Sequence, residues 1–398
     1  MLLIKSPNFL LVLLGATVLT IPMPMLIILG GLAGLQLSPG EGLATLPVSI
    51  QLLAGLFTAT PMSILMGARG RKAGFLLAAL FAVLGGALAA YSLIHGLFAL
   101  LCFAHALLGA AVVSFGLFRF AAAELVAAPQ QAKAISLTLG SGLVAALLAP
   151  EVFRLFKDSL APVPLAGAYL AVSAIALAGM LPIAAAKFAP PQPKAGKDKS
   201  RGQTAALWNR PRLLWAILCG VGSFAGMMLL MTPTPLAMVG CGFSDVQAAD
   251  VIRWHVVAMF APSFFTGSLI TRFGANAIVA TGAVLLALSG LTALAGIELV
   301  HFYVSLVLLG LGWNFGFVGA TTLLNSELMD SEKSLFQGIN DTGIALGAAI
   351  ASFSSGLMIA SVGWAMIAAA LLGFAAVVAF SSFKQRQAVS NTSSLVQY

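Results

Sequence analysis

The chain has 398 residues, of which 60% are hydrophobic and only 8% are charged, and its mean hydropathy is +1.03. Soluble domains carry about 25% charged residues, so this composition excludes a chain that covers itself with a water-facing surface. A helix that crosses a bilayer needs about 20 apolar residues, and twelve such helices would use roughly 240 residues. We therefore expect a polytopic membrane protein without a large soluble domain.

Long apolar runs separated by short polar breaks predict an all-α protein with twelve transmembrane helices. The first run has no small-residue cleavage site before Pro22, so we interpret it as a span rather than a removable signal. In chain order, the predicted spans cover residues 8–30, 43–66, 73–93, 96–123, 134–152, 164–186, 211–239, 247–269, 274–297, 300–325, 334–360 and 361–383.

The basic residues predict how the chain is oriented. With the N-terminus inside, sixteen of the 20 Lys and Arg residues fall in inner segments, whereas the outer loops hold only Arg154 and Lys157. Because positive residues stay on the cytoplasmic side of a membrane, both termini are predicted to be cytoplasmic. The net charge of +8 therefore reflects topology, and we expect no nucleic-acid partner.

The longest polar break divides the chain. Residues 187–210 are rich in Pro, Gly and charge, and they predict a cytoplasmic basic linker. It separates an N-terminal six-helix half (1–186) from a C-terminal six-helix half (211–383), which a cytoplasmic tail (384–398) follows. Two such halves around a central cavity are a transporter architecture, in which the halves rock to expose a midplane site to each side in turn.

A short pattern recurs in both halves. Pro61 is followed ten residues later by Arg71, after the second span, and Pro262 is followed ten residues later by Arg272, after the eighth. The two patterns lie at matching places, which favours an internal duplication.

The loops that contain these arginines, GARGRK at 67–72 and GSLITRFG at 267–274, resemble the cytoplasmic loop signature of the major facilitator superfamily. The aspartate that is usual in that signature is missing from both loops. The resemblance implies the two-half fold and a gating role for Arg71 and Arg272. Positive charge that fixes the topology is the other interpretation of the same residues.

Soft metal-ligand residues gather in the seventh and eighth spans. Met227 and Met231 are four residues apart, as are His255 and Met259, so each pair occupies one helix face. Counted from the outer surface, both pairs lie roughly 12–18 Å deep, near the middle of the membrane. Antiparallel neighbouring helices would therefore bring three thioethers and an imidazole to one level.

This ligand set suits a soft metal ion, because thioethers prefer Cu(I) and imidazole accepts copper readily. Other interpretations stay open: methionines at helical spacing are common in apolar cores, and an intramembrane histidine such as His255 serves as a proton relay or packs against a hydrogen-bonded partner. The sequence Thr-Pro-Thr-Pro at 232–235 should break the seventh span near this level.

The same residues resemble those of the CcoA-like copper importers, a branch of the major facilitator superfamily linked to assembly of cbb3-type cytochrome c oxidase. That branch has paired M-x-x-x-M and H-x-x-x-M motifs flanked by two cysteines, which fall here at Cys219 and Cys241. The resemblance implies that the Met and His side chains are copper ligands and that the cysteines are redox or relay thiols. The cysteines are about 33 Å apart along an unbroken helix, too far for a disulfide.

Other polar and aromatic residues receive secondary interpretations. Asp341, near the start of the eleventh span, is the candidate for proton coupling, although compensation of the helix dipole explains it equally well. Arg119 and Glu124 anchor the inner end of span four or shape an inner gate. His105 has no obvious partner, and Trp313 needs no role beyond packing.

The resulting hypothesis is a copper importer that works by alternating access, with copper as substrate and no prosthetic group. It implies a multi-pass monomer in a bacterial inner membrane that passes copper to cytoplasmic copper-handling proteins. The alternative is import of a small organic molecule such as riboflavin, since 26 phenylalanines could line an aromatic cavity. A membrane enzyme is disfavoured because the histidines and carboxylates are scattered over different spans, and a purely structural protein would not need a midplane histidine among methionines.

Overall fold

The structure is a computed structural model, and every regular element in its described part is helical. The predicted tail 384–398 and most of the predicted linker 187–210 lie outside the described residues. The structure describes residues 6–39, 43, 46–188, 190, 210–361, 363–373 and 375–376.

The described chain forms two compact units by its internal contacts. Unit 1 draws on the described residues within 1–134, 141–204 and 329–345, and unit 2 draws on those within 135–140, 205–328 and 346–398. Two long helices, α7 (Gln131–Phe156) and α16 (Asp330–Ser361), therefore supply residues to both units.

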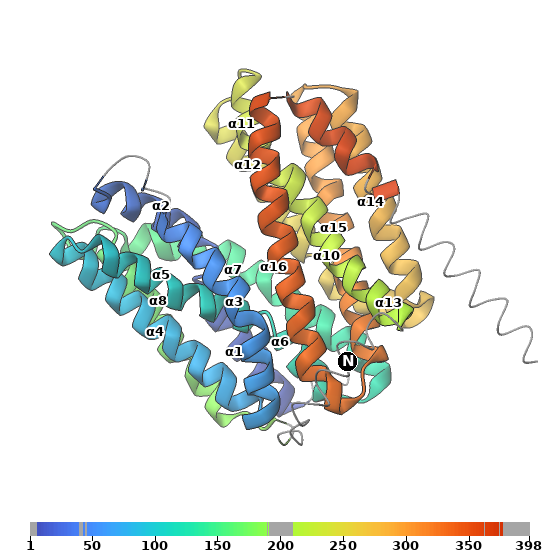
Figure 1. Ribbon diagram of the computed structural model, residues 1–398, viewed down its shortest axis with the longest axis horizontal. Coiled ribbons are helices and arrows are strands. Elements are labelled where there is room, and N and C mark those ends of the chain that lie inside the picture. Colours follow the sequence, from blue (N-terminus) through green and yellow to red (C-terminus); the bar gives the residue numbers. More distant parts are fainter. Residues whose placement is uncertain are drawn as a thin grey trace, which may run out of the picture. The chain divides into compact units, whose positions relative to one another are not determined.

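Unit 1 is a bundle in which α4 packs against α5 and α8, α3 packs against α5, and α1 packs against α8 (Figure 1). Small residues allow this packing, because a Cβ at Gly86 would lie 2.6 Å from the carbonyl oxygen of Tyr169 on α8. Besides parts of α7 and α16, its helices are α1 (Pro7–Thr20), α2 (Met25–Leu37), α3 (Leu46–Arg69), α4 (Arg71–His95), α5 (Phe98–Phe115), α6 (Phe118–Glu124), η3 (Ala128–Gln130) and α8 (Ala166–Ala185).

Unit 2 is organised around α15, which packs along α14, α10 and α12. A further apolar helix runs over Gly363–Gly373. The other helices are α10 (Pro211–Met231), α11 (Thr234–Gly240), α12 (Asp245–Phe260), α13 (Ser263–Phe273), α14 (Ala275–Ala295) and α15 (Leu299–Glu327).

The helices follow the predicted spans closely, but several spans are interrupted. In the first, α1 ends at Thr20 and α2 begins at Met25, and prolines occupy the break. The predicted break in the seventh span is confirmed, since α10 ends at Met231 and α11 begins at Thr234. Within the described residues, eight helices are long and apolar enough to cross a membrane, or nine if the pair α12 and α13, bent by 41°, is one span. The twelve-span count and the cytoplasmic termini stay predictions.

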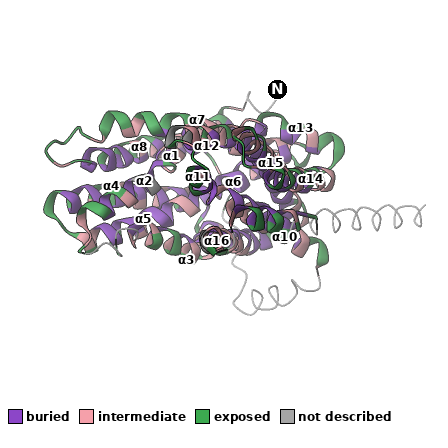
Figure 2. Ribbon diagram, turned by 90° about the horizontal axis from the view of Figure 1, so that it is seen from above, coloured by how far each residue is buried: buried purple, intermediate pink, exposed green. Residues whose placement is uncertain are grey.

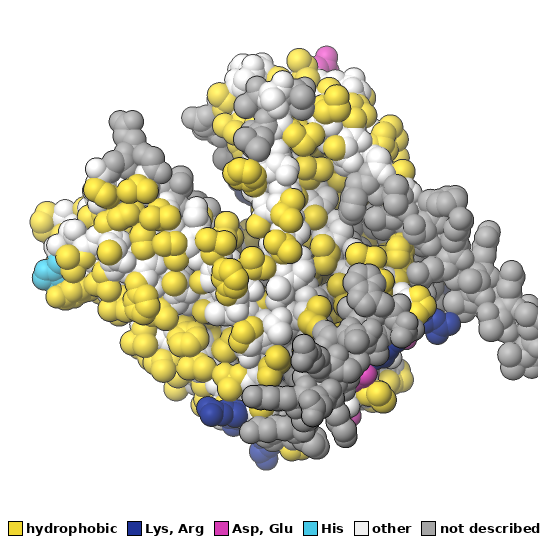
Figure 3. All heavy atoms as spheres, in the orientation of Figure 1, with side chains coloured by type: hydrophobic (Ala, Val, Ile, Leu, Met, Phe, Trp, Pro, Cys, Tyr) yellow, Lys and Arg dark blue, Asp and Glu magenta, His cyan; other side chains and the backbone are white. Residues whose placement is uncertain are grey.

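The surfaces of both units are apolar, as a lipid-facing surface requires. Phe57 in unit 1 and Phe353 in unit 2 are 72% and 73% exposed. Helices such as α4 and α14 are buried along one face and exposed along the other (Figure 2). In the view of Figure 3, hydrophobic side chains cover most of the described surface of unit 1. Because all backbone groups inside these helices bond within the helix, such a surface is stable in lipid.

The close contact between α14 and α15 predicts a strong effect of one methyl group. A Cβ at Gly282 would lie 2.5 Å from the backbone nitrogen of Gly316 and 2.8 Å from the carbonyl oxygen of Gly312, whereas one at Gly31 meets nothing within 4 Å. Gly282→Ala should therefore lower the stability by about 1–3 kcal/mol, as overpacking does. Thermal unfolding of the purified protein in detergent measures this, with Gly31→Ala as control. Equal melting temperatures for the two variants would refute the close packing.

The predicted orientation can be tested at a native thiol. Cys241 is exposed just after α11, in a loop predicted to be outside, whereas Cys102 and Cys219 are buried. A membrane-impermeant maleimide should label intact cells that express the wild type and should not label Cys241→Ser. If label appears only after the cells are opened, the predicted orientation is reversed.

Candidate functional site

The first methionine pair lies on the buried side of α10. Met227 is 2% exposed and Met231 is half-buried, one helical turn further on. The helix ends there because Pro233 has no backbone N–H to continue the hydrogen-bond ladder. At this end the hydroxyl of Thr232 is buried and has no partner in the described part of the chain.

The two cysteines of the resemblance lie in different surroundings. Cys219 is 1% exposed and packs against Val279 of α14 and Ala320 of α15. Cys241 is exposed, and both thiols are free, as their separation along the chain predicted. The structure therefore does not bring the two thiols together.

His255 is fully buried on α12 and is held in one tautomer. Its Nδ1 lies 2.8 Å from the carbonyl oxygen of Leu306 on α15, and a carbonyl can only accept, so Nδ1 carries the hydrogen. In the neutral ring Nε2 is then an acceptor, and it has no partner among the described residues. This arrangement presents a lone pair to a metal ion or to a donor on an organic molecule. Met259, one turn away, is 7% exposed.

The two motifs meet through a third helix. The sequence predicted that the helices of Met227 and His255 are neighbours, but α10 and α12 each have α15 as their principal neighbour. Trp313 of α15 contacts Phe224 of α10 at 5.7 Å and Phe260 of α12 at 5.8 Å, measured between ring centroids. Since Met227 lies within one turn of Phe224, and Met259 adjoins Phe260, both methionines share the level of Trp313.

An aromatic cluster therefore lies at the same level as the copper ligands that the sequence predicted. The Trp313 ring stacks on Phe317 at 5.0 Å and 11°, and Phe224 and Phe260 meet it edge-on. Sequence reasoning gave Trp313 only a packing role. The signal was present, because Trp313 and Phe317 are four residues apart and so occupy one face of α15.

The bend between α12 and α13 is stabilised by one asparagine. Pro262 lies at the bend, and the side-chain amide of Asn314 on α15, which is fully buried, donates a 2.7 Å hydrogen bond to the carbonyl oxygen of Met259. The same amide donates to the hydroxyl of Ser263 at 2.5 Å, and its oxygen accepts from Thr266 at 2.7 Å. The bend is therefore fixed by α15, next to the second motif.

Both copies of the loop signature lie against a serine from a helix that is shared between the units. In unit 1, a Cβ at Gly67 would lie 2.6 Å from the hydroxyl of Ser334 at the start of α16. In unit 2, the N–H of Gly267 donates to the hydroxyl of Ser136 on α7 at 3.0 Å. This correspondence agrees with the predicted internal duplication.

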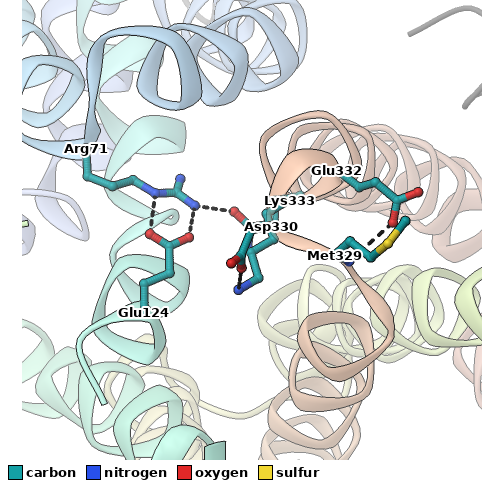
Figure 4. A network of polar contacts seen from close by, with 7 residues as sticks. Arg71, Glu124, Met329, Asp330, Glu332 and Lys333 are labelled. Atoms are coloured by element: carbon teal, nitrogen blue, oxygen red, sulfur yellow. Dashed lines mark hydrogen bonds and ion pairs between the residues drawn. The ribbon is translucent and has the colours of Figure 1, made fainter. Parts of the chain in front are cut away.

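The two candidate gating arginines differ in their surroundings. Arg71, 5% exposed, donates to both carboxylate oxygens of Glu124 at 3.1 and 2.5 Å and to the amide oxygen of Gln337 at 2.5 Å (Figure 4). Glu124 thus supplies the carboxylate that the signature loop lacks. Arg272 is exposed, and its guanidinium lies 5.1 Å from the centroid of the Phe273 ring.

The candidate for proton coupling is part of a buried ion pair. Asp341 accepts from Arg119, and both side chains are less than 7% exposed. The side-chain amide of Asn340 donates to the same carboxylate oxygen of Asp341 at 2.9 Å. Arg119 and Asp341 are 222 residues apart in sequence, so neither could be assigned to the other from spacing.

His105, for which the sequence showed no partner, has two. Its Nδ1 lies 2.8 Å from the amide oxygen of Gln51, and its Nε2 lies 2.7 Å from the hydroxyl of Tyr169. All three residues are buried in unit 1, and both ring nitrogens are satisfied. We therefore assign this histidine to the core.

Comparison with known proteins gives both relatives and a fold. The chain is 38% identical over 347 residues to the riboflavin transporter RfnT of Brucella anthropi, covering 86% of this chain and 87% of that protein. It is 29% identical over 363 residues to YdeG of Bacillus subtilis, an uncharacterized MFS-type transporter, covering 86% and 83%. The structure of FucP, a major facilitator superfamily transporter in the outward conformation, superposes with a TM-score of 0.81 at 16% identity, covering 95% of this chain and 98% of that one. No family model matches the chain.

These comparisons support a multi-pass membrane transporter, and they favour the organic-molecule alternative over the copper expectation. RfnT is a riboflavin transporter, and neither it nor the other proteins named supports copper, metal binding or cytochrome oxidase assembly. RfnT, YdeG and FucP are all named as transporters, a class of protein that is generally not enzymatic.

The buried pair of Arg119 and Asp341 predicts a large effect when one partner is removed. Arg119→Met leaves a buried carboxylate without its cation and should lower the stability by about 3–5 kcal/mol, whereas Arg119→Met with Asp341→Leu should recover most of it. The exposed pair of Arg154 and Glu151, 69% and 56% exposed, serves as control, and Arg154→Met should change little. Melting curves in detergent decide this. If Arg119→Met alone melted at the wild-type temperature, the pairing of Arg119 with Asp341 would be contradicted.

Proposed function

The chain belongs to the major facilitator superfamily of membrane transporters, and we propose that it imports riboflavin, or a planar heteroaromatic molecule of the same class, by alternating access. The observation that carries this proposal is the 38% identity to a riboflavin transporter along 86% of the chain. Similarity of this extent covers every helix that forms the candidate site, rather than a single motif.

The geometry of unit 2 supports the same substrate class. The aromatic cluster of Phe224, Phe260, Trp313 and Phe317 brings four rings together, and a flat ring that entered among them would make stacked or edge-to-face contacts, which are favourable beyond the area they bury. Binding sites for small molecules are mostly apolar and aromatic, with a few polar groups that fix the orientation. The buried nitrogen of His255 is such a group.

Copper import is the second candidate, and one observation favours it. His255 donates from Nδ1 to a backbone carbonyl and leaves Nε2 bare, as metal-ligating histidines do, and the thioether of Met259 follows one turn later. Under this alternative, Met227 and Met231 would complete the ligand set, with Cys219 and Cys241 as relay thiols.

We further propose that transport is driven by an ion gradient across a bacterial inner membrane. No ATP-binding loop occurs in the sequence, so the driving force comes from outside the chain. Asp341 is our candidate for the coupling group, since loss of its charge would release Arg119. Arg71, which bridges Glu124 and Gln337, is our candidate for a gate that opens in the same cycle.

Riboflavin and copper uptake by cells separate the two candidates. A riboflavin-requiring bacterium without its own importer should accumulate labelled riboflavin when it expresses the wild type, but not with an empty vector. Met227→Leu should retain at least half of this uptake, because an alkyl side chain replaces the thioether at similar volume. Labelled copper should enter equally with the wild type and the vector.

The opposite pattern would overturn the proposal. If wild type accumulates copper and not riboflavin, and Met227→Leu or His255→Ala abolishes copper uptake at equal membrane abundance, the chain is a copper importer. Arg154→Met, an exposed outer residue, controls for expression.

A further inference from the structure

Four buried polar atoms in unit 2 have no hydrogen-bond partner among the described residues, and two of them are chemically complementary. Nε1 of Trp313 is a donor, and Trp313 is only 3% exposed. Nε2 of the fully buried His255 is an acceptor, because Nδ1 of that ring donates to Leu306. Folded proteins seldom leave such groups unpaired, so each indicates a partner from outside the chain.

Both side chains lie along one stretch of α15, which carries Trp313 and accepts the hydrogen bond of His255 from α12. His255 is attached to this helix at Leu306, and Trp313 follows two helical turns later, on the same face and about 10 Å along the axis. A Cβ at Gly310, between them, would lie 2.6 Å from the backbone carbonyl of His255, so α12 lies directly against this stretch.

A metal ion alone does not account for both atoms. The indole N–H has no lone pair to give, so it can only donate to an acceptor on a ligand. A molecule that satisfies both atoms must carry an acceptor and a donor that are separated by several ångströms. The part of this molecule that contacts the indole of Trp313 should be an aromatic ring, because other aromatic rings already surround the indole.

We propose that Trp313 and His255 together bind a flavin-like substrate. The flat ring stacks on the indole and a ring carbonyl accepts from Nε1 of Trp313, while a hydroxyl of the ribityl chain donates to Nε2 of His255. This assignment rests on the proposed function and adds to it the residues that select the substrate.

Two side chains lie where the flat ring of the substrate would approach Trp313. Phe224 on α10 and Phe260 on α12 are both half-buried, and each meets the indole edge-on, at interplanar angles of 75° and 77°. In this proposal, rotation of either side chain would uncover the indole, whereas Phe317, stacked on Trp313 and 4% exposed, would stay behind it.

Flavin binding to the purified full-length protein tests the assignment, with quenching of flavin fluorescence as the signal. The two probes are riboflavin and lumiflavin, which has the ring but no ribityl chain. Trp313→Phe keeps an aromatic ring but removes the donor together with the second ring of the indole, so it should raise the Kd of both probes roughly ten-fold. His255→Leu should raise the Kd of riboflavin by a similar factor and leave that of lumiflavin unchanged.

The matched control is Trp364→Phe, because Nε1 of Trp364 already donates to the carbonyl oxygen of Ala293 at 3.1 Å. It should bind both flavins as wild type does. Both substitutions remove the same side-chain volume, but only Trp364→Phe also loses an internal hydrogen bond, so its melting temperature should fall further than that of Trp313→Phe.

The outcomes distinguish this site from the proposed function. If wild type binds flavin and Trp313→Phe binds both probes as tightly as wild type does, the proposed site is wrong and the proposed function stands. If Trp364→Phe weakens binding as much as Trp313→Phe, the effect is general and the site is again wrong. If wild type binds neither flavin, both proposals fall.

Discussion

Close backbone contact along α15 determines the arrangement of unit 2. Its glycines face different neighbours: Gly310 meets the backbone of α12, Gly312 and Gly319 meet the backbone of α14, and Gly316 meets Ser223 of α10. In lipid there is no hydrophobic force between helices, so packing and hydrogen bonds must hold them together, and small residues permit both. The side chains that α15 does carry, Trp313 above all, then point into the spaces that remain between its neighbours.

The same helix connects the packing of unit 2 to its chemistry. Leu306 fixes the tautomer of His255, and Asn314 holds the bend at Pro262. A substrate that displaces Phe224 or Phe260 from Trp313 would therefore act on the packing of α10 and α12 against α15. These contacts would then couple binding to helix movement, as alternating access requires.

The sequence predicted the helices well because hydropathy over 20 residues reports directly on burial in lipid. It also predicted the break after Met231 and the matching loops, since proline and repeated glycine and arginine act locally. It failed where distant residues decide the result. The partners of His105 are 54 and 64 residues away, and the partner of Asp341 is 222 residues away. The neighbour of α10 and α12 is a helix that comes later in the chain than both. For this reason the similar depths of Met227 and His255 suggested that their helices are direct neighbours, and the position of Trp313 between them was not predicted.

The central claim is that this chain carries a flavin-like organic molecule, and transport by the purified protein tests it most directly. Liposomes that contain only this protein would be given labelled riboflavin or labelled copper, with protein-free liposomes alongside. The account predicts that riboflavin enters the protein-containing liposomes faster than the protein-free ones and that copper does not. Entry of copper without entry of riboflavin would contradict it.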